Sequence, residues 1–228
     1  MFKNEMLLLK KENEVQIKNL RDDDVQTIKD IMKSMSIFKV NSYDAQVIKR
    51  DLIGMAQEFE LRNKTLHDAI GNDVKGFANE IIENSGGPCK CEIFLGFLLK
   101  LSGYFFAWFL VLSVGAYGGS LGWNVDPIIF LFYFSVVILS FVTEGLIDPI
   151  FSTEKGFKKE FGSLIPIILF LAVSIIYYFL YDKQNVRQID VGYIVLISGV
   201  SYLITKYLNS KNIQNLASNK KNFIQDLR

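Results

Sequence analysis

The sequence predicts an all-α protein in which an N-terminal cytoplasmic helical bundle is followed by a four-helix transmembrane domain. Apolar residues fill most of the chain from Ile93 to Leu208, whereas charged residues are spread through residues 1–91. In the charged part the apolar residues recur every three or four positions, which is the period of one helix face. We therefore divide the chain into a cytoplasmic helical domain (1–91), a four-span transmembrane domain (92–208) and an amphipathic cytoplasmic tail (209–228).

Three apolar stripes predict the helices of residues 1–91. They are formed by Val25, Ile28, Met32 and Met35, by Ala45, Ile48, Leu52, Met55 and Phe59, and by Val74, Phe77, Ala78 and Ile81. Residues that favour the N-cap position stand at the start of these stripes, at Asp22–Asp24, Asn41–Ser42 and Asn72–Asp73. Because no segment here alternates apolar and polar residues for long, we expect a compact bundle of roughly three to five short helices without strands.

Four apolar segments are long enough to cross a membrane, at about 93–116, 127–147, 163–181 and 190–208. The clearest, Ser163–Tyr181, contains no charged residue in nineteen positions. A helix needs about 20 mostly apolar residues to cross the hydrocarbon core of a bilayer. Pro166 is expected in the first turn of its helix, where its missing N–H costs little. The segments predict a multi-pass protein of the cell membrane.

Basic residues are distributed unevenly between the connections. The connection 117–126 has no Lys or Arg, and the connection 182–190 has only Lys183 and Arg187. The loop 148–162 and the C-terminal region carry Lys155, Lys158, Lys159, Lys206, Lys211, Lys220, Lys221 and Arg228. Cytoplasmic loops hold the excess of Lys and Arg, so both termini are predicted to be cytoplasmic. An irregular apolar face on the tail is expected to lie against the N-terminal domain or the lipid headgroups.

Two charged residues, Lys100 and Glu144, lie within the apolar segments at comparable predicted depth. A charge at the bilayer centre costs about 2.5–3.5 kcal/mol on insertion scales, and a Lys100–Glu144 pair would offset part of that cost. The functional interpretation is an ion or proton site, or a polar switch between helices. The alternative is that Lys100 extends along its helix to the headgroups and Glu144 is simply interfacial.

A helix-junction motif is formed by Gly71, Asp73, Phe77 and Glu80, in the pattern Gly-x-Asp-Val-x-x-Phe-x-x-Glu-Ile-Ile. Gly71 suits the exit from one helix, and Asp73 suits the N-cap of the next. The same region contains Asp51-Leu52, Glu58 and the acidic run after Leu20. Together with the helix-junction motif, these residues make the segment of about 20–82 resemble a small helical family of unknown function from Gram-positive bacteria. Members of that family accompany PadR-type transcription regulators and are grouped with HAAS signalling domains. The resemblance implies an all-helical cytoplasmic domain in membrane-stress or antimicrobial response, and no catalytic residue.

No motif in the sequence predicts an enzyme. The single histidine, His67, stands beside Asp68 without a nucleophile, and phosphate-binding, dinucleotide-binding and H-E-x-x-H patterns are absent. Asp22–Asp24 are expected to favour a helix N-terminus rather than to bind a cation. We therefore expect no catalytic residue, no cofactor and no metal.

Cys89 and Cys91, spaced by one residue before the first span, fall short of the four ligands of a structural zinc site. They are expected to be incidental linker thiols, with lipidation as the alternative. A net charge of +1 gives no overall field for nucleic acid, so no direct binding to nucleic acid is expected.

These features support two hypotheses about function. In the first, the chain is a non-enzymatic, membrane-anchored signalling or regulatory protein whose residues 1–91 bind a cytoplasmic protein, of which a PadR-type regulator is an example. In the second, it is a small transporter subunit or an immunity protein that uses the Lys100–Glu144 pair.

Overall fold

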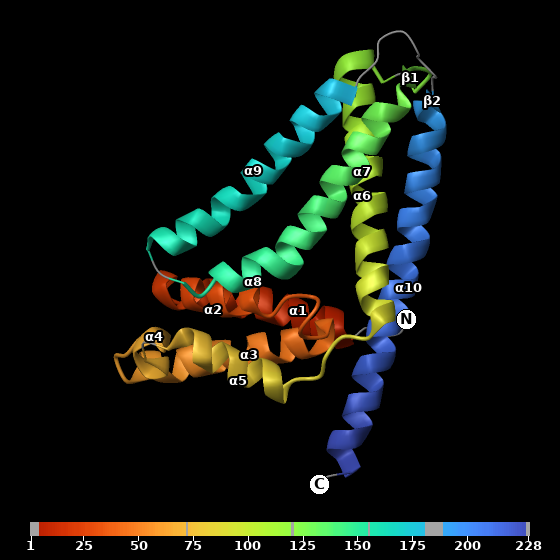
Figure 1. The fold of residues 1–228 in the computed structure, drawn as a ribbon. Helices are drawn as coiled ribbons and strands as arrows, with labels where there is room; N and C mark the ends of the chain where they lie inside the picture. Colours follow the sequence, from red (N-terminus) through yellow and green to blue (C-terminus); the bar gives the residue numbers. More distant parts are fainter. Residues whose placement is uncertain (1–4, 72, 120, 155, 181–188, 227–228) are drawn as a thin grey trace. The chain divides into compact units, whose positions relative to one another are not determined.

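The structure is a computed structural model that describes residues 5–71, 73–119, 121–154, 156–180 and 189–226 (Figure 1). The described residues are almost entirely helical. The α-helices are α1 (Glu5–Gln16), α2 (Asp22–Ser34), α3 (Ser42–Leu61), α4 (Leu66–Ile70), α5 (Val74–Asn84), α6 (Lys90–Tyr117), α7 (Pro127–Val142), α8 (Asp148–Phe151), α9 (Phe157–Leu180) and α10 (Val191–Asp226). A 3-10 turn η1 (Ile17–Asn19), a π-helical turn η2 (Thr143–Ile147) and two short strands, β1 (Asn124–Val125) and β2 (Ile189–Asp190), complete the elements. The predicted helical class is confirmed.

The chain divides into two compact units. The first consists of the described parts of Met1–Ile93, Glu144–Gly162 and Ser210–Arg228. The second consists of those of Phe94–Thr143 and Ser163–Asn209. The N-terminal helices therefore share a unit with the loop that follows the second span and with the C-terminal tail, two segments far away in the sequence.

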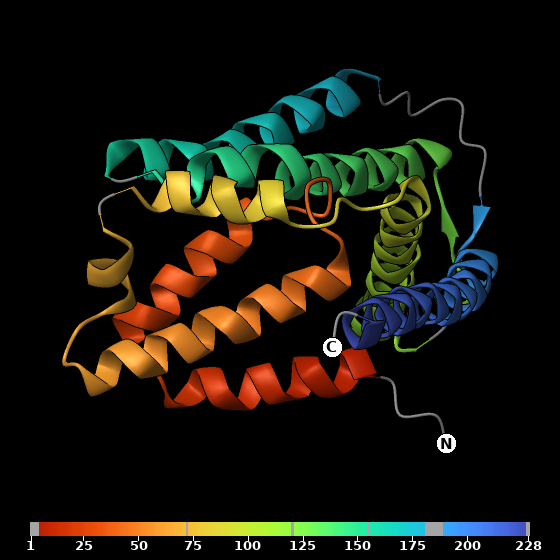
Figure 2. The ribbon, with the colours of Figure 1, turned by 90° about the horizontal axis from the view of Figure 1, so that it is seen from below.

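An aliphatic core holds the N-terminal helices of the first unit together. Ile28 and Ile31 of α2 are fully buried, as are Ile53 and Ala56 of α3. Each fully buried isoleucine side chain contributes about 1.5–3 kcal/mol. In α3 the buried face is centred on Leu52, Ile53 and Ala56, whereas the other members of the predicted stripe are only half-buried at its edge. Figure 2 shows α1 running along α3, with which it makes extensive contact.

The structure keeps two of the three expected N-caps. The side chain of Asn41 accepts a hydrogen bond from the backbone N–H of Asp44 at 2.9 Å, and that of Asp73 accepts one from Gly76 at 2.8 Å. The expectation for Asp22–Asp24 is wrong in detail, because the N-cap residue of α2 is Arg21, which makes no side-chain cap. Asp24 is instead fully buried and bonds to another helix, as described below.

Four helical segments in the described part of the chain are long and apolar enough to cross a membrane: Lys90–Gly115, Pro127–Phe151, Glu160–Leu180 and Val191–Ser218. They coincide with the four predicted spans, and each extends beyond the prediction by three residues or more at one end, so the prediction of a multi-pass arrangement is supported by length and composition. Pro166 lies inside α9, which begins nine residues earlier at Phe157, so its expected place in the first turn is wrong. Proline is tolerated inside membrane helices where neighbouring groups satisfy the freed carbonyl.

The second unit has an aromatic core at one end. Phe105 and Phe109 of α6 and Val191, Ile194 and Val195 of α10 are buried there. β1 and β2 pair antiparallel, with Asn124 opposite Asp190 (Figure 1). This pairing joins the first connection between spans to the end of the third. The expected cations of the third connection, Lys183 and Arg187, lie outside the described residues.

Candidate functional site

The predicted helix-junction motif lies at the turn between α4 and α5. Gly71 ends α4 with φ of 83°, a left-handed conformation that glycine adopts without a Cβ penalty. Asp73 then caps α5, and Phe77 packs against the aliphatic core. Glu80 lies two turns into α5 and is exposed. The first three residues therefore build the junction, whereas Glu80 belongs to the surface.

Glu80 lines a groove between α3 and α5 with a volume of about 460 Å³. Val47 and Ile48 contribute from α3, and Phe77 and Ile81 from α5; all four are half-buried. The remaining lining residues are polar or acidic, namely Asp44, Glu80, Asn84, Ser85 and Gly86. The groove thus combines an apolar floor with an acidic rim, a combination that the sequence did not reveal because its two sides are about 30 residues apart along the chain.

A buried carboxylate ties α4 to α2. Asp24 Oδ1 accepts a hydrogen bond from the backbone N–H of Leu66 at 2.6 Å, and Asp24 Oδ2 lies 3.2 Å from Arg21 Nε. Leu66 is the first residue of α4, so its N–H has no partner within that helix. Arg21 also donates to the carbonyl of Lys64. The acidic run after Leu20 therefore supplies a structural anchor.

A second polar junction joins the start of α3 to the start of the first span. The Asn41 side chain donates to the Gly86 carbonyl at 2.8 Å, and Asp44 Oδ2 accepts from the Gly86 N–H at 3.0 Å. Glu92, which is 1 % exposed, accepts from the Ser42 N–H at 2.7 Å through Oε1. Glu92 was not predicted from the sequence as a site residue. The sequence feature that could have identified Glu92 is a single acidic residue at the start of an apolar run. The N-terminus of a helix also stabilises an acidic side chain.

A third junction connects the N-terminal helices to the loop between the second and third spans. Lys75 Nζ of α5 lies 2.8 Å from Glu154 Oε1. This hydrogen bond and the Lys75 charge lower the pKa of the Glu154 carboxyl below its usual value. The ring of Phe38 occupies the place that a Cβ at Gly145 would take, and α8 packs on α2. Gly145 belongs to the π-helical turn η2, a type of turn that is frequent at functional sites.

The predicted intramembrane residues lie in separate units. Lys100 belongs to α6 in the second unit, with its ammonium 5.9 Å from the ring centre of Tyr104 and 6.0 Å from that of Phe141. Such cation–π contacts contribute about 0.5–2 kcal/mol. Glu144 belongs to η2 in the first unit and is exposed. Their pairing stays a prediction.

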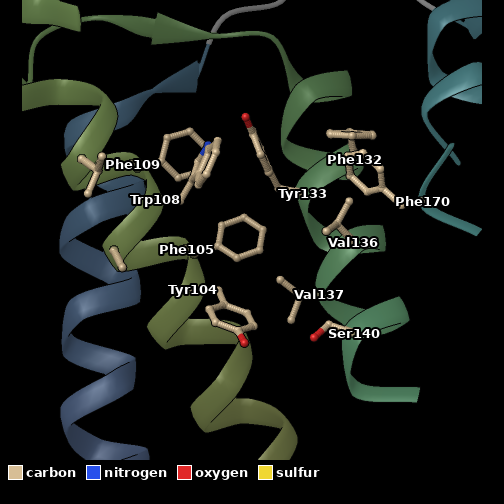
Figure 3. A pocket seen from close by; sticks show the side chains of 12 residues that line it. Tyr104, Phe105, Trp108, Phe109, Phe132, Tyr133, Val136, Val137, Ser140 and Phe170 are labelled. Carbon is tan, nitrogen blue, oxygen red and sulfur yellow. The ribbon is translucent and has the colours of Figure 1, made fainter. Parts of the chain in front are cut away.

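The second unit contains an apolar cavity of about 700 Å³ between α6, α7 and α9 (Figure 3). Figure 3 shows the Trp108 and Phe105 side chains on α6, Tyr133 and Val137 on α7, and Phe170 on α9. The hydroxyl groups among the lining side chains belong to Tyr104, Tyr133 and Ser140. Cavities of this size and composition suit apolar ligands.

Within the described ranges, no group of three or more His, Cys, Asp or Glu side chains is placed to hold a metal ion. Cys89 and Cys91 are exposed free thiols, and Cys89 Sγ accepts a hydrogen bond from the Glu92 N–H at 3.2 Å. His67 lies in the short helix α4. Asp68, beside it, forms a reciprocal cap with Thr65, and these bonds lower the pKa of its carboxyl.

Comparisons with protein-family models, with curated proteins and with solved structures found no match to the chain. The resemblance to the HAAS-type family therefore stays an expectation, and the site must be interpreted from its own geometry.

Proposed function

We propose that the chain is a non-enzymatic regulatory protein of the cell membrane, whose N-terminal helices bind a cytoplasmic regulator under the control of the membrane spans. The observation that carries the proposal is the third junction, formed by Lys75 with Glu154 and by Phe38 with Gly145. Because the second and third spans lead directly into this loop, a change in those spans reaches the N-terminal helices through it. The bilayer is the first partner, and a PadR-type regulator is the class of protein partner that the family resemblance suggests.

The composition of the first unit supports a cytoplasmic location for both termini. This unit gathers the N-terminal helices, the lysine-rich loop 148–162 and the C-terminal tail. The first and third connections, which are poor in lysine and arginine, meet instead through β1 and β2. The segments rich in lysine and arginine therefore share one unit, and the segments poor in them pair with each other. Lysine and arginine are in excess on the cytoplasmic side of a membrane protein.

The experiment is a pull-down of the full-length protein from its native membrane in mild detergent, compared with a variant that lacks residues 1–91. We expect a transcription regulator or another cytoplasmic regulator to co-purify with the full chain only. The truncated variant should still enter the membrane, because all four spans remain. Capture of the same partner by the truncated variant would remove the basis of the proposal.

The Lys100 environment favours a second candidate function, a small transporter subunit or an immunity protein. The Lys100 ammonium lies near two aromatic rings within a span, and charged side chains inside spans commonly mark functional sites. The Glu144→Gln variant tests this function. Loss of flux or of toxin protection at unchanged abundance would support it, whereas an unaffected phenotype would count against it.

A further inference from the structure

The groove between α3 and α5 has the form of a binding site for a helix. It is lined along α5 from Phe77 to Asn84, a length of about 10 Å at 1.5 Å per residue. Its floor consists of the half-buried apolar residues Val47, Ile48, Phe77 and Ile81. An amphipathic helix places apolar residues at positions i, i+3, i+4 and i+7 into grooves of this kind.

The two walls of the groove are fixed in place before any partner binds. The end of α5 is tied to the start of α3 by the hydrogen bonds of Asn41 and Asp44 with Gly86. The start of α5 is fixed by the Asp73 cap and by the packing of Val74 in the core. In a preformed site the side chains are already ordered, so partner binding loses less free energy to ordering them.

The charged residues that line the groove, among those the structure describes, are both acidic. Glu80 is exposed on the α5 rim, and Asp44 lies at the end where α3 begins. The neighbouring cation of α5, Lys75, is engaged with Glu154. The rim therefore favours a partner with Lys or Arg beside its apolar face and disfavours an acidic one.

We infer that this groove binds an amphipathic helix of a partner protein that carries Lys or Arg along the edge facing Glu80. The inference rests on the proposed function, since it names the surface through which the N-terminal helices capture their partner. The lining residues belong to α3, α5 and the turn after α5, so the described part of the chain does not fill the groove itself. Main-chain pairing with an extended peptide is disfavoured, because both walls are helices whose backbone groups are already bonded.

The test uses the full chain in nanodiscs of zwitterionic lipid and a fluorescent synthetic helix of about 14 residues, with Leu at helical spacing and flanking Lys. Fluorescence anisotropy measures its dissociation constant. Glu80→Lys should weaken binding about tenfold through like-charge repulsion, whereas the matched control Glu83→Lys should change it less than about twofold. Glu83 is an exposed acid of the same helix outside the groove, so the two variants share the same change in net charge.

A second peptide, with Glu in place of Lys, sharpens the test. It should bind the Glu80→Lys protein better than the unchanged protein. Equal effects of the two charge reversals, or equal binding to empty nanodiscs, would overturn the inference. A dimer that Glu80→Lys converts to a monomer would also overturn it, because the occupant would then be a second copy of this chain.

The pull-down separates this inference from the proposed function. If Glu80→Lys keeps the regulator and removal of residues 1–91 loses it, the function stands and the groove assignment fails. If both lose the regulator while Glu83→Lys retains it, both are supported. If the truncated chain retains the regulator, the proposed function fails, and the assignment of the groove to that partner fails with it.

Discussion

The interactions inside the first unit of this protein differ in kind from those inside the second. In the first, polar side chains bond across elements far apart in the sequence, as Asp24 does with Leu66 and Glu92 does with Ser42. In the second, the serine hydroxyls of Ser102 and Ser174 bond to carbonyls of their own helices. Aromatic rings make many of its contacts between helices, as Phe105 does with Phe130 at 4.8 Å between ring centres. The fold is therefore specified by directional bonds in the first unit and by less directional ring contacts in the second.

The physical reason is the solvent. In the proposed cytoplasmic location, the N-terminal helices would gain stability by removing apolar side chains from water, and buried polar groups must then find partners with defined geometry. Helices within a bilayer gain little from burying apolar surface against each other, because lipid is equally apolar. Their association depends on shape and on a few hydrogen bonds, so we expect the second unit to tolerate substitution better than the first.

Removal of the buried Asp24 carboxylate should have the largest effect. Asp24→Ala leaves the Leu66 N–H and part of the Arg21 charge without a partner, at a cost of about 2–4 kcal/mol in the free energy of unfolding of the first unit. Hydrogen exchange of residues 20–82 in nanodiscs measures it. Asp22→Ala, an exposed acid of the same helical turn, should cost less than about 0.5 kcal/mol. Similar changes in the free energy of unfolding for the two variants would mean that the buried Asp24 contributes no more to stability than an exposed acid.

The contact between Phe38 and Gly145 comes next. Gly145→Ala places a methyl group where the Phe38 ring lies, so we expect a destabilisation of about 1–3 kcal/mol and faster hydrogen exchange in η2 and α8. Gly54→Ala is the matched control, because no atom lies within 4 Å of the added Cβ and alanine favours the helix. An unchanged exchange rate in Gly145→Ala would argue against the third junction as the route between spans and N-terminal helices.

A hydrogen bond of the second unit should contribute less. Ser135 Oγ and Tyr177 Oη lie 2.9 Å apart and join α7 to α9. A double-mutant cycle with Ser135→Ala and Tyr177→Phe should give a coupling free energy of about 0.6 kcal/mol, the average for such bonds between membrane helices. A coupling as large as the Asp24 effect would break the contrast between the two units.

The smallest effect should be a pH dependence of the third junction. The Glu154 carboxyl has a lowered pKa in the folded protein, because Lys75 bonds to its charged form. Its contribution is therefore fully present above the ordinary glutamate pKa and is lost as the pH falls through the lowered value. Hydrogen exchange of α8 should rise as the pH falls through that range, after correction for the intrinsic exchange rate. Lys75→Ala should remove most of the dependence, because the remaining cation, Lys158, lies 4.0 Å from Glu154 Oε2 and lowers the pKa less. An unchanged dependence in that variant would assign it to another group.

Much of the fold was accessible from the sequence because its signals are local. The helical period around Leu52 predicted α3, and Asn41 and Asp73 predicted two N-caps through contacts only three residues long. The candidate site was accessible only in fragments. Phe77 and Glu80 were singled out, but on the wall opposite them Ile48 was assigned to the core alone and Val47 was not singled out.

The errors have the same origin. Asp24 lies in the first turn of α2, as the sequence suggested, yet its carboxylate bonds to the first N–H of α4 and not to its own helix. Pro166 seemed to begin a helix because the apolar run begins near it, but polar and charged residues from Phe157 onward extend α9 on its N-terminal side. The position of Asp24 depends on a residue distant in the chain, and the start of α9 depends on residues outside the apolar run.

The amino-acid sequence alone predicts that the chain is helical, that four segments suit a bilayer, and where the basic residues lie relative to those segments. These properties depend on composition and on a period of three to four residues, and both can be read from the amino-acid sequence of any one segment. Only the tertiary structure decided that the N-terminal helices share a unit with the loop of Glu154 and with the tail, and that α3 and α5 enclose an acidic groove. The reason is that such contacts join residues separated by 30 to 80 positions, and no local rule of helix formation specifies which of them meet.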